Sequence, residues 1–293
     1  MDILVKVLGV VAPVFILAGC GYVWVRMRLG YDLAFVSRLA MTLGMPCLIF
    51  TALARAEVDH AAMRDLAFAA LAGYAAIAVL SYGMCRLFRL DIRAMLSPII
   101  FGNTGNIGLP VILFAYGDTG LAYALVVFAV MIILNFSLGV WLVSGEGSRE
   151  MLRQPMVYGA ILGGFALYFD YDPPDWAMNT LTLLGQISIP LMLITLGVAI
   201  ARLSARDVGL ALGVSALKLA VGAGVSVVLV LAFGLGWGAA GGAFLLQMTM
   251  PVAVSSYLLA ARYNTHPDAV AGLVVVSTLL SVPAIPVMLA FLL

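Results

Sequence analysis

The sequence predicts an all-α membrane protein of ten transmembrane helices, arranged as two inverted five-helix repeats. Of its 293 residues, 64% are hydrophobic and 10% are charged, which leaves too few polar side chains to cover a soluble protein of this size. Apolar runs long enough to cross a hydrocarbon core of roughly 30 Å recur along the whole chain. Several markers of the first half also recur, in the same order, in the second half.

The apolar runs define the helices in chain order. Trp24, Trp141, Trp176 and Trp237 lie near their ends, where indole rings favour the headgroup layer of a bilayer. The predicted helices 1 to 10 span residues 3–25, 33–54, 65–87, 95–116, 120–144, 155–170, 177–200, 208–233, 239–261 and 268–293.

The repeat rests on four markers that return 141 to 144 residues later. A unit of five helices crosses the membrane an odd number of times, so its second copy enters from the opposite side. We therefore predict inverted repeats over residues 1–150 and 151–293, an arrangement typical of secondary transporters. The marker pairs are Pro13 and Pro155, Pro46 and Pro190, Arg64-Asp65 and Arg206-Asp207, and Pro110 and Pro251.

The distribution of basic residues predicts the orientation. Arginines concentrate in or near the connections after helices 1, 3, 5, 7 and 9, whereas the opposite side carries only Lys6, Arg55 and Arg64. Because positive residues stay on the cytoplasmic side, both termini should lie outside a plasma (bacterial inner) membrane. The arginines on the predicted cytoplasmic side are Arg26, Arg28, Arg38, Arg86, Arg89, Arg93, Arg149, Arg153, Arg202, Arg206 and Arg262.

Several function classes are not indicated. No basic cluster suggests nucleic acid, and Cys20, Cys47 and Cys85 have no paired spacing that would predict a disulfide or a zinc site. We expect no cofactor and no metal ion. We also expect no enzyme, because no His, Asp and Glu cluster and no serine–lysine pair is identifiable at membrane depth.

Helix 4 contains a run of glycines and amides that ends in Pro110, the run Gly102-Asn-Thr-Gly-Asn-Ile-Gly-Leu-Pro. Proline lacks a backbone donor, and Gly105 and Gly108 loosen the helical ladder, so the helix should be interrupted near mid-membrane. Asn103 and Asn106 can donate hydrogen bonds to an anion without adding a charge.

Helix 9 repeats the pattern more weakly, with Gln247 and Pro251 followed by Ser255. Interrupted helices at matching positions of two repeats indicate a transport site, and the free N–H groups after each interruption suit a carboxylate. The predicted substrate-binding residues are Asn103, Asn106, Pro110, Gln247, Pro251 and Ser255. A pair of structural proline kinks is the alternative.

Lys218 is the one charged residue well inside a predicted span. It could balance the charge of an anion, take part in coupling, or hold the carbonyl groups of the interrupted helix 4 in place of a metal ion. A purely structural lysine remains the alternative. All fourteen Asp and Glu residues lie in connections or at span ends, which disfavours antiport coupled through a carboxylate.

These motifs resemble those of the auxin efflux carrier family, which includes plant PIN carriers and bacterial malonate-type carriers. Asn103-Thr104 with Gly108-Leu109-Pro110 is similar to the family's helix 4 motif. Gln247 with Pro251, followed by the segment Tyr263-Asn-Thr-His-Pro-Asp268, is similar to its helix 9 and the turn into helix 10. Lys218 resembles the family's basic residue in helix 8, although the usual proline just after it is missing.

The resemblance implies a crossover fold like that of sodium/bile-acid carriers, in which helices 4 and 9 cross at their interruptions. Helices 1, 2, 6 and 7 would form a scaffold that is usually dimeric, and helices 3 to 5 and 8 to 10 would form a moving transport domain. The resemblance also implies an elevator motion, a substrate contact at Asn103, and crossover prolines at Pro110 and Pro251.

We therefore predict a secondary transporter of small organic anions, with carboxylates as substrates and efflux as the favoured direction, since an inside-negative potential drives anions outward. The alternative is a sodium-coupled carrier of the bile-acid type. A passive channel is a further alternative. The expected partners are the anion, the lipid bilayer and a second copy of the chain.

Overall fold

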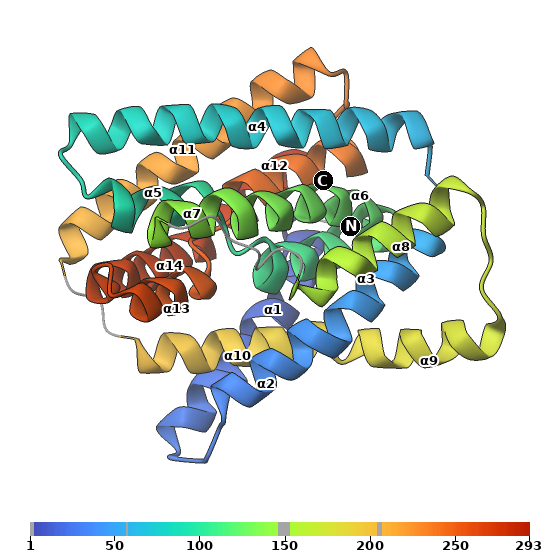
Figure 1. The fold of residues 1–293 in the computed structure, drawn as a ribbon, viewed down its shortest axis with the longest axis horizontal. Helices are drawn as coiled ribbons and strands as arrows, with labels where there is room; N and C mark the ends of the chain where they lie inside the picture. Colours follow the sequence, from blue (N-terminus) through green and yellow to red (C-terminus); the bar gives the residue numbers. More distant parts are fainter. Residues whose placement is uncertain (1–2, 57, 146–152, 204–206) are drawn as a thin grey trace.

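The computed structural model describes residues 3–56, 58–145, 153–203 and 207–293 of the chain. Within these residues the structure is helical, with one isolated β-bridge (Figure 1). Arg149, Arg206 and the expected repeat boundary at residues 150 and 151 lie outside the described residues. The first half contains α1 (Ile3–Arg26), α2 (Leu33–Leu39), the π-helix η1 (Ala40–Gly44), α3 (Met45–Ala54), α4 (His60–Leu87), α5 (Ile92–Ile100), η2 (Thr104–Gly108), α6 (Leu109–Leu134), η3 (Asn135–Gly139) and α7 (Val140–Ser144). The second half contains α8 (Pro155–Tyr168), α9 (Asp175–Gln186), α10 (Ser188–Arg202), α11 (Val208–Ala232), α12 (Ala239–Thr249), α13 (Val254–Tyr263) and α14 (Pro267–Leu292).

Seven continuous helical segments of the described chain are long and apolar enough to cross a membrane. One of them, Thr104–Ser144, has 41 residues and contains Gly117, whose φ of 65° and ψ of −157° bend the backbone out of the helical conformation. The interrupted pair α12 and α13, together with α5 and α8, are each shorter than a full span. The structure thus has the helices of a multi-pass membrane protein. That the chain crosses the membrane ten times stays a prediction.

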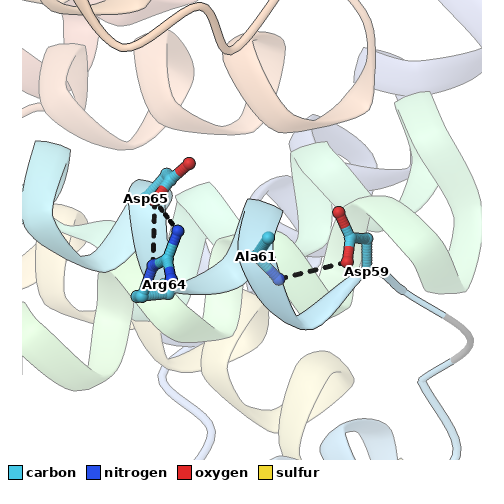
Figure 2. A network of polar contacts seen from close by, with 4 residues as sticks. All are labelled: Asp59, Ala61, Arg64 and Asp65. Carbon is cyan, nitrogen blue, oxygen red and sulfur yellow. Dashed lines mark hydrogen bonds and ion pairs between the residues drawn. The ribbon is translucent and has the colours of Figure 1, made fainter.

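Helix α4 begins earlier than the hydrophobic pattern predicts. The Asp59 side chain accepts a hydrogen bond from the Ala61 backbone nitrogen at 3.1 Å and so caps a helix that starts at His60 rather than at residue 65 (Figure 2). The polar residues of this first turn fall outside the apolar run, which is why the predicted start was wrong. Arg64 and Asp65 form an exposed ion pair there, an interaction that contributes little to stability.

Most helix contacts can be described as two groups, which also pack on each other where α6 contacts α1, α3 and α8 and where α1 contacts α14. The α1 group consists of α1, α2, η1, α3, α8, α9 and α10, in which α1 packs on α10 and α3 packs on α8 and α9. The α4 group consists of α4, α5, η2, α6, η3, α7 and α11 to α14, in which α4, α6, α11 and α12 contact one another. In Figure 1, α4 lies along the upper edge of the view, and α9 and α10 lie along the lower part.

Glycines hold the pair α1 and α10 unusually close. A Cβ at Gly21 would fall on the carbonyl oxygen of Ile194, and a Cβ at Gly197 would fall on the carbonyl oxygen of Ala18. These two reciprocal contacts bring the helix backbones together, as small residues do in membrane helix pairs.

We expect Gly21→Ala to separate α1 from α10, because its methyl group has no space. Overpacking of this kind costs about 1–3 kcal/mol, which should lower the melting temperature in detergent by roughly 2–12 °C. Gly19→Ala is the matched control, since a Cβ at Gly19, two residues away on the same helix, meets nothing within 4 Å. Equal melting temperatures for the two variants would contradict the close packing.

Candidate functional site

The first interruption lies between α5 and η2. Asp91 caps α5 through hydrogen bonds from the backbone nitrogens of Arg93 and Ala94, and the helix runs to Ile100. Phe101 is then extended, with φ −95° and ψ 119°, and helical structure resumes at Thr104. The residues between Ile100 and Thr104 therefore leave the helical conformation, and the Asn103 backbone N–H points away from the regular helical hydrogen-bond pattern.

The second interruption lies between α12 and α13, where residues 250–253 leave the helical conformation. The two interruptions pair with each other. Gly102 and Val252 form an antiparallel β-bridge, and the Asn103 backbone nitrogen donates to the Pro251 carbonyl oxygen at 2.6 Å. The Val252 nitrogen donates to Ser277 Oγ at 3.0 Å. Each interruption thus supplies hydrogen-bond partners that the other lacks.

The interruption between α5 and η2, in the predicted helix 4, comes before most of the glycine and proline motif that was expected to cause it. Gly105 and Gly108 lie in the π-helix η2, and Pro110 lies at the start of α6, which continues from η2 without a break. The glycines instead permit close packing. A Cβ at Gly105 would press on Phe128 and Met192, and a Cβ at Gly108 would press on Gln247.

A cavity of about 130 Å³ opens at the crossing. The first turns of η2 and of α13 both border it, and the first N–H groups of each have no carbonyl partner in their own helix. Two positive helix ends therefore face one space, which is the arrangement that favours an anion. The residues that line it from the two interrupted segments are Phe101, Gly102, Asn103, Gly105, Asn106, Ala253, Val254 and Ser255.

Asn103 is the clearest candidate for a polar contact with a ligand in this cavity. Its side chain is 4% exposed, and Nδ2 has no hydrogen-bond partner in the described part of the chain. A buried donor of this kind is costly unless an acceptor reaches it. Asn106 and Ser255, two other predicted binding residues, line the same cavity.

The remaining predicted binding residues lie away from the cavity lining. Gln247 is 1% exposed, and its Nε2 donates to the Ala124 carbonyl oxygen at 3.3 Å, which links α12 to α6. Pro251 lies in the second interruption and borders a separate, smaller space next to Lys218. Pro110 is buried at the start of α6. These three residues shape the crossing rather than line its open space.

Lys218 lies directly behind the crossing. It is 6% exposed, and its Nζ donates to the Ile99 carbonyl oxygen at 2.7 Å, in the last turn of α5 before the first interruption. A space of about 10 Å³ beside it is bordered by Met250 and Pro251 of the second interruption. Lys218 therefore bonds to the helix that leads into the first interruption and borders the same small space as the second.

Sequence reasoning missed much of the cavity wall. Asn135 lies in the π-helix η3, and Ser37 and Thr195 come from the α1 group. The Thr195 hydroxyl and the Tyr31 hydroxyl share a hydrogen bond of 2.8 Å. Asn135 is a lone amide in an apolar span, a signal that could have been used. The rest of the wall is apolar: Leu33, Met41, Phe128, Met131, Ile132, Phe136, Met156, Met192 and Leu258.

Comparison with known proteins shows the family of the chain. A family model described as "Membrane transport protein" matches residues 6–152 and 139–289, nearly the whole chain. The chain belongs to this family. The resemblance to auxin efflux carriers seen in the helix 4 and helix 9 motifs is thereby confirmed, and the family consists of transporters rather than enzymes.

A curated relative of this membrane transport protein comes from Rhizobium meliloti (strain 1021) and is named "Putative malonate transporter". The two are 21% identical over 308 aligned positions, which cover 96% of this chain and 94% of the relative.

We expect a thiol reagent to separate the residues that line the cavity from those behind it. In a protein whose Cys20, Cys47 and Cys85 are replaced by alanine, Ser255→Cys should react with a small charged reagent within minutes. Gln247→Cys should stay unmodified, because its side chain is buried against α6. Modification of the position 247 cysteine at the same rate would contradict the cavity described here.

Proposed function

We propose that this membrane transport protein is a secondary carrier of small organic anions that binds the substrate carboxylate at the crossing of its two interrupted helices. The observation that carries the proposal is the unpaired Asn103 Nδ2 in a cavity that two helix N-termini face. A carboxylate accepts hydrogen bonds only, so it satisfies both the amide and the free N–H groups. Asn106 and Ser255 add further donors.

The apolar wall favours one carboxylate on a compact apolar body. No Lys, Arg, Asp or Glu lines the cavity among the described residues, and methionine, phenylalanine and aliphatic side chains form much of its wall. A second carboxylate, as in the malonate of the relative's name, would be buried without a partner, which is costly. We therefore place monocarboxylates such as benzoate ahead of dicarboxylates.

Lys218 would balance the substrate charge from behind the crossing. Its ammonium group holds the Ile99 carbonyl and lies next to the second interruption, so a bound anion gains a favourable electrostatic interaction without touching it. A resident cation at this place also disfavours a sodium ion there. We take uniport over the sodium-coupled alternative for this reason.

An elevator motion would carry the site across the membrane. In this proposal the α1 group is the scaffold, which would also form the contacts of a homodimer, and the α4 group is the transport domain. The division of helices between the groups and the antiparallel pairing of the two interruptions support it. The inverted five-helix repeats, the outward termini in a plasma (bacterial inner) membrane and efflux are parts of the same proposal, and the arginine distribution supports the orientation.

We expect Asn103→Ala to weaken benzoate binding and anion current. A lost hydrogen bond to a charged group costs about 1.5–3 kcal/mol, which corresponds to roughly a tenfold to 150-fold loss of affinity. Binding is measured by calorimetry, and transport as current on a supported membrane, to which leakage of the neutral acid does not contribute. The exposed Asn179→Ala is the control. Unchanged affinity in Asn103→Ala, at an unchanged melting temperature, would remove the site assignment.

We expect Lys218→Met to lower benzoate affinity about tenfold, the effect of a charge on the order of 10 Å away at an effective dielectric constant of about 20. Lys6→Met, at the exposed start of α1, should have no effect.

In the unmodified carrier, replacing sodium by choline should leave the current intact. A current that collapses in choline would instead select the sodium-coupled carrier.

A further inference from the structure

A second, wholly apolar groove lies between α6 and α8. It has a volume of about 180 Å³, and Ile133 and Ile161 at its edges are 43% and 60% exposed. In a protein that spans a membrane, such an exposed aliphatic surface faces lipid tails. The residues that line the groove are Ala129, Ile132, Ile133, Met156, Val157, Ala160 and Ile161.

The groove shares part of its wall with the cavity at the crossing. Ile132 and Met156 border both spaces, and they are 2% and 4% exposed. These two side chains therefore separate the lipid-facing groove from the candidate substrate cavity. Met156 is the more adaptable of the two, since an unbranched thioether changes rotamer easily.

A positively charged residue precedes the α8 side of the groove in the sequence. Arg153 is exposed, and it precedes Pro155 and Met156 at the start of α8, so it lies within a few residues of the groove. Basic residues at the end of a membrane helix lie at the headgroup level and attract anionic lipids. An apolar groove beside an interfacial arginine matches the two parts of an anionic phospholipid.

We propose that this groove binds an acyl chain of an anionic phospholipid whose headgroup pairs with Arg153, and that the lipid thereby supports the wall formed by Ile132 and Met156. The groove lies between α6 of the α4 group and α8 of the α1 group. If the proposed transport function holds, the lipid occupies the boundary along which the two groups slide. The effect on transport rests on that proposed function, whereas lipid binding does not.

Native mass spectrometry of the purified, delipidated protein tests the binding site directly. Phosphatidylglycerol and phosphatidylcholine with identical acyl chains are added in turn, without any carboxylate. The unmodified protein should retain phosphatidylglycerol several-fold more strongly than phosphatidylcholine. Arg153→Gln should remove this preference, whereas Arg86→Gln, at the end of α4, should keep it.

Ala160→Trp should fill the groove and reduce the retention of both lipids, whereas Ala75→Trp on the exposed face of α4 should not. Ala160→Leu serves as the milder substitution if the tryptophan variant fails to fold. Equal lipid retention by the unmodified protein, Arg153→Gln and the position 160 variant would overturn the proposal. A change of oligomeric state in the Ala160 variant, with lipid retention unchanged, would identify the groove as a contact between copies and would also overturn it.

Transport provides the second readout. Adding phosphatidylglycerol to phosphatidylcholine liposomes should raise benzoate current several-fold for the unmodified carrier and leave Ala160→Trp unaffected. A current that does not respond to the lipid would remove the link between groove and cavity. A current unaltered by Asn103→Ala would instead contradict the carboxylate site and leave the lipid retention result standing.

Discussion

The structure depends on one constraint, that backbone groups freed at membrane depth must find partners within the protein. The interruption after Ile100 and the one after Thr249 meet this constraint by pairing with each other. Asn103 donates its backbone N–H to the Pro251 carbonyl oxygen at 2.6 Å, next to the bridge between Gly102 and Val252. Because neither interruption is satisfied alone, the two helices have to meet where they are broken, and the packing of α4, α6, α11 and α12 follows around that meeting point.

The same constraint makes an anion site without a charged lining. Each interrupted helix resumes with a first turn whose N–H groups lack partners, and both first turns border one cavity. The Asn103 amide adds a buried donor that finds no partner among the residues that the structure describes. If a charged side chain lined the cavity, the substrate would have to break an ion pair with it in every transport cycle. Lys218 instead contributes its charge from behind the crossing, where it donates a hydrogen bond to the Ile99 carbonyl oxygen.

The polar part of this site could be predicted from the sequence, because amides, prolines and a lysine stand out in apolar spans. Asn103, Asn106 and Ser255 line the cavity and Lys218 lies behind the crossing, whereas the polar lining residues Asn135, Ser37 and Thr195 were not predicted. The apolar wall could not be predicted, since which methionines and phenylalanines face a cavity depends on how distant helices pack. The early start of α4 also escaped the hydrophobic pattern, which cannot register a polar first turn capped by Asp59. The position of the first interruption, ahead of Gly105 and Gly108, is set by pairing with a segment some 150 residues away.

The most direct measurement is a structure of the carrier with 4-bromobenzoate bound, in which the bromine marks one end of the molecule. We expect the carboxylate within hydrogen-bond distance of Asn103 and the first turn of α13, and the bromine among the methionine and phenylalanine side chains of the wall. A ligand seated instead in the larger cavity of about 610 Å³ between α3, α6, α9 and α10, next to Arg55, would contradict an anion site at the crossing.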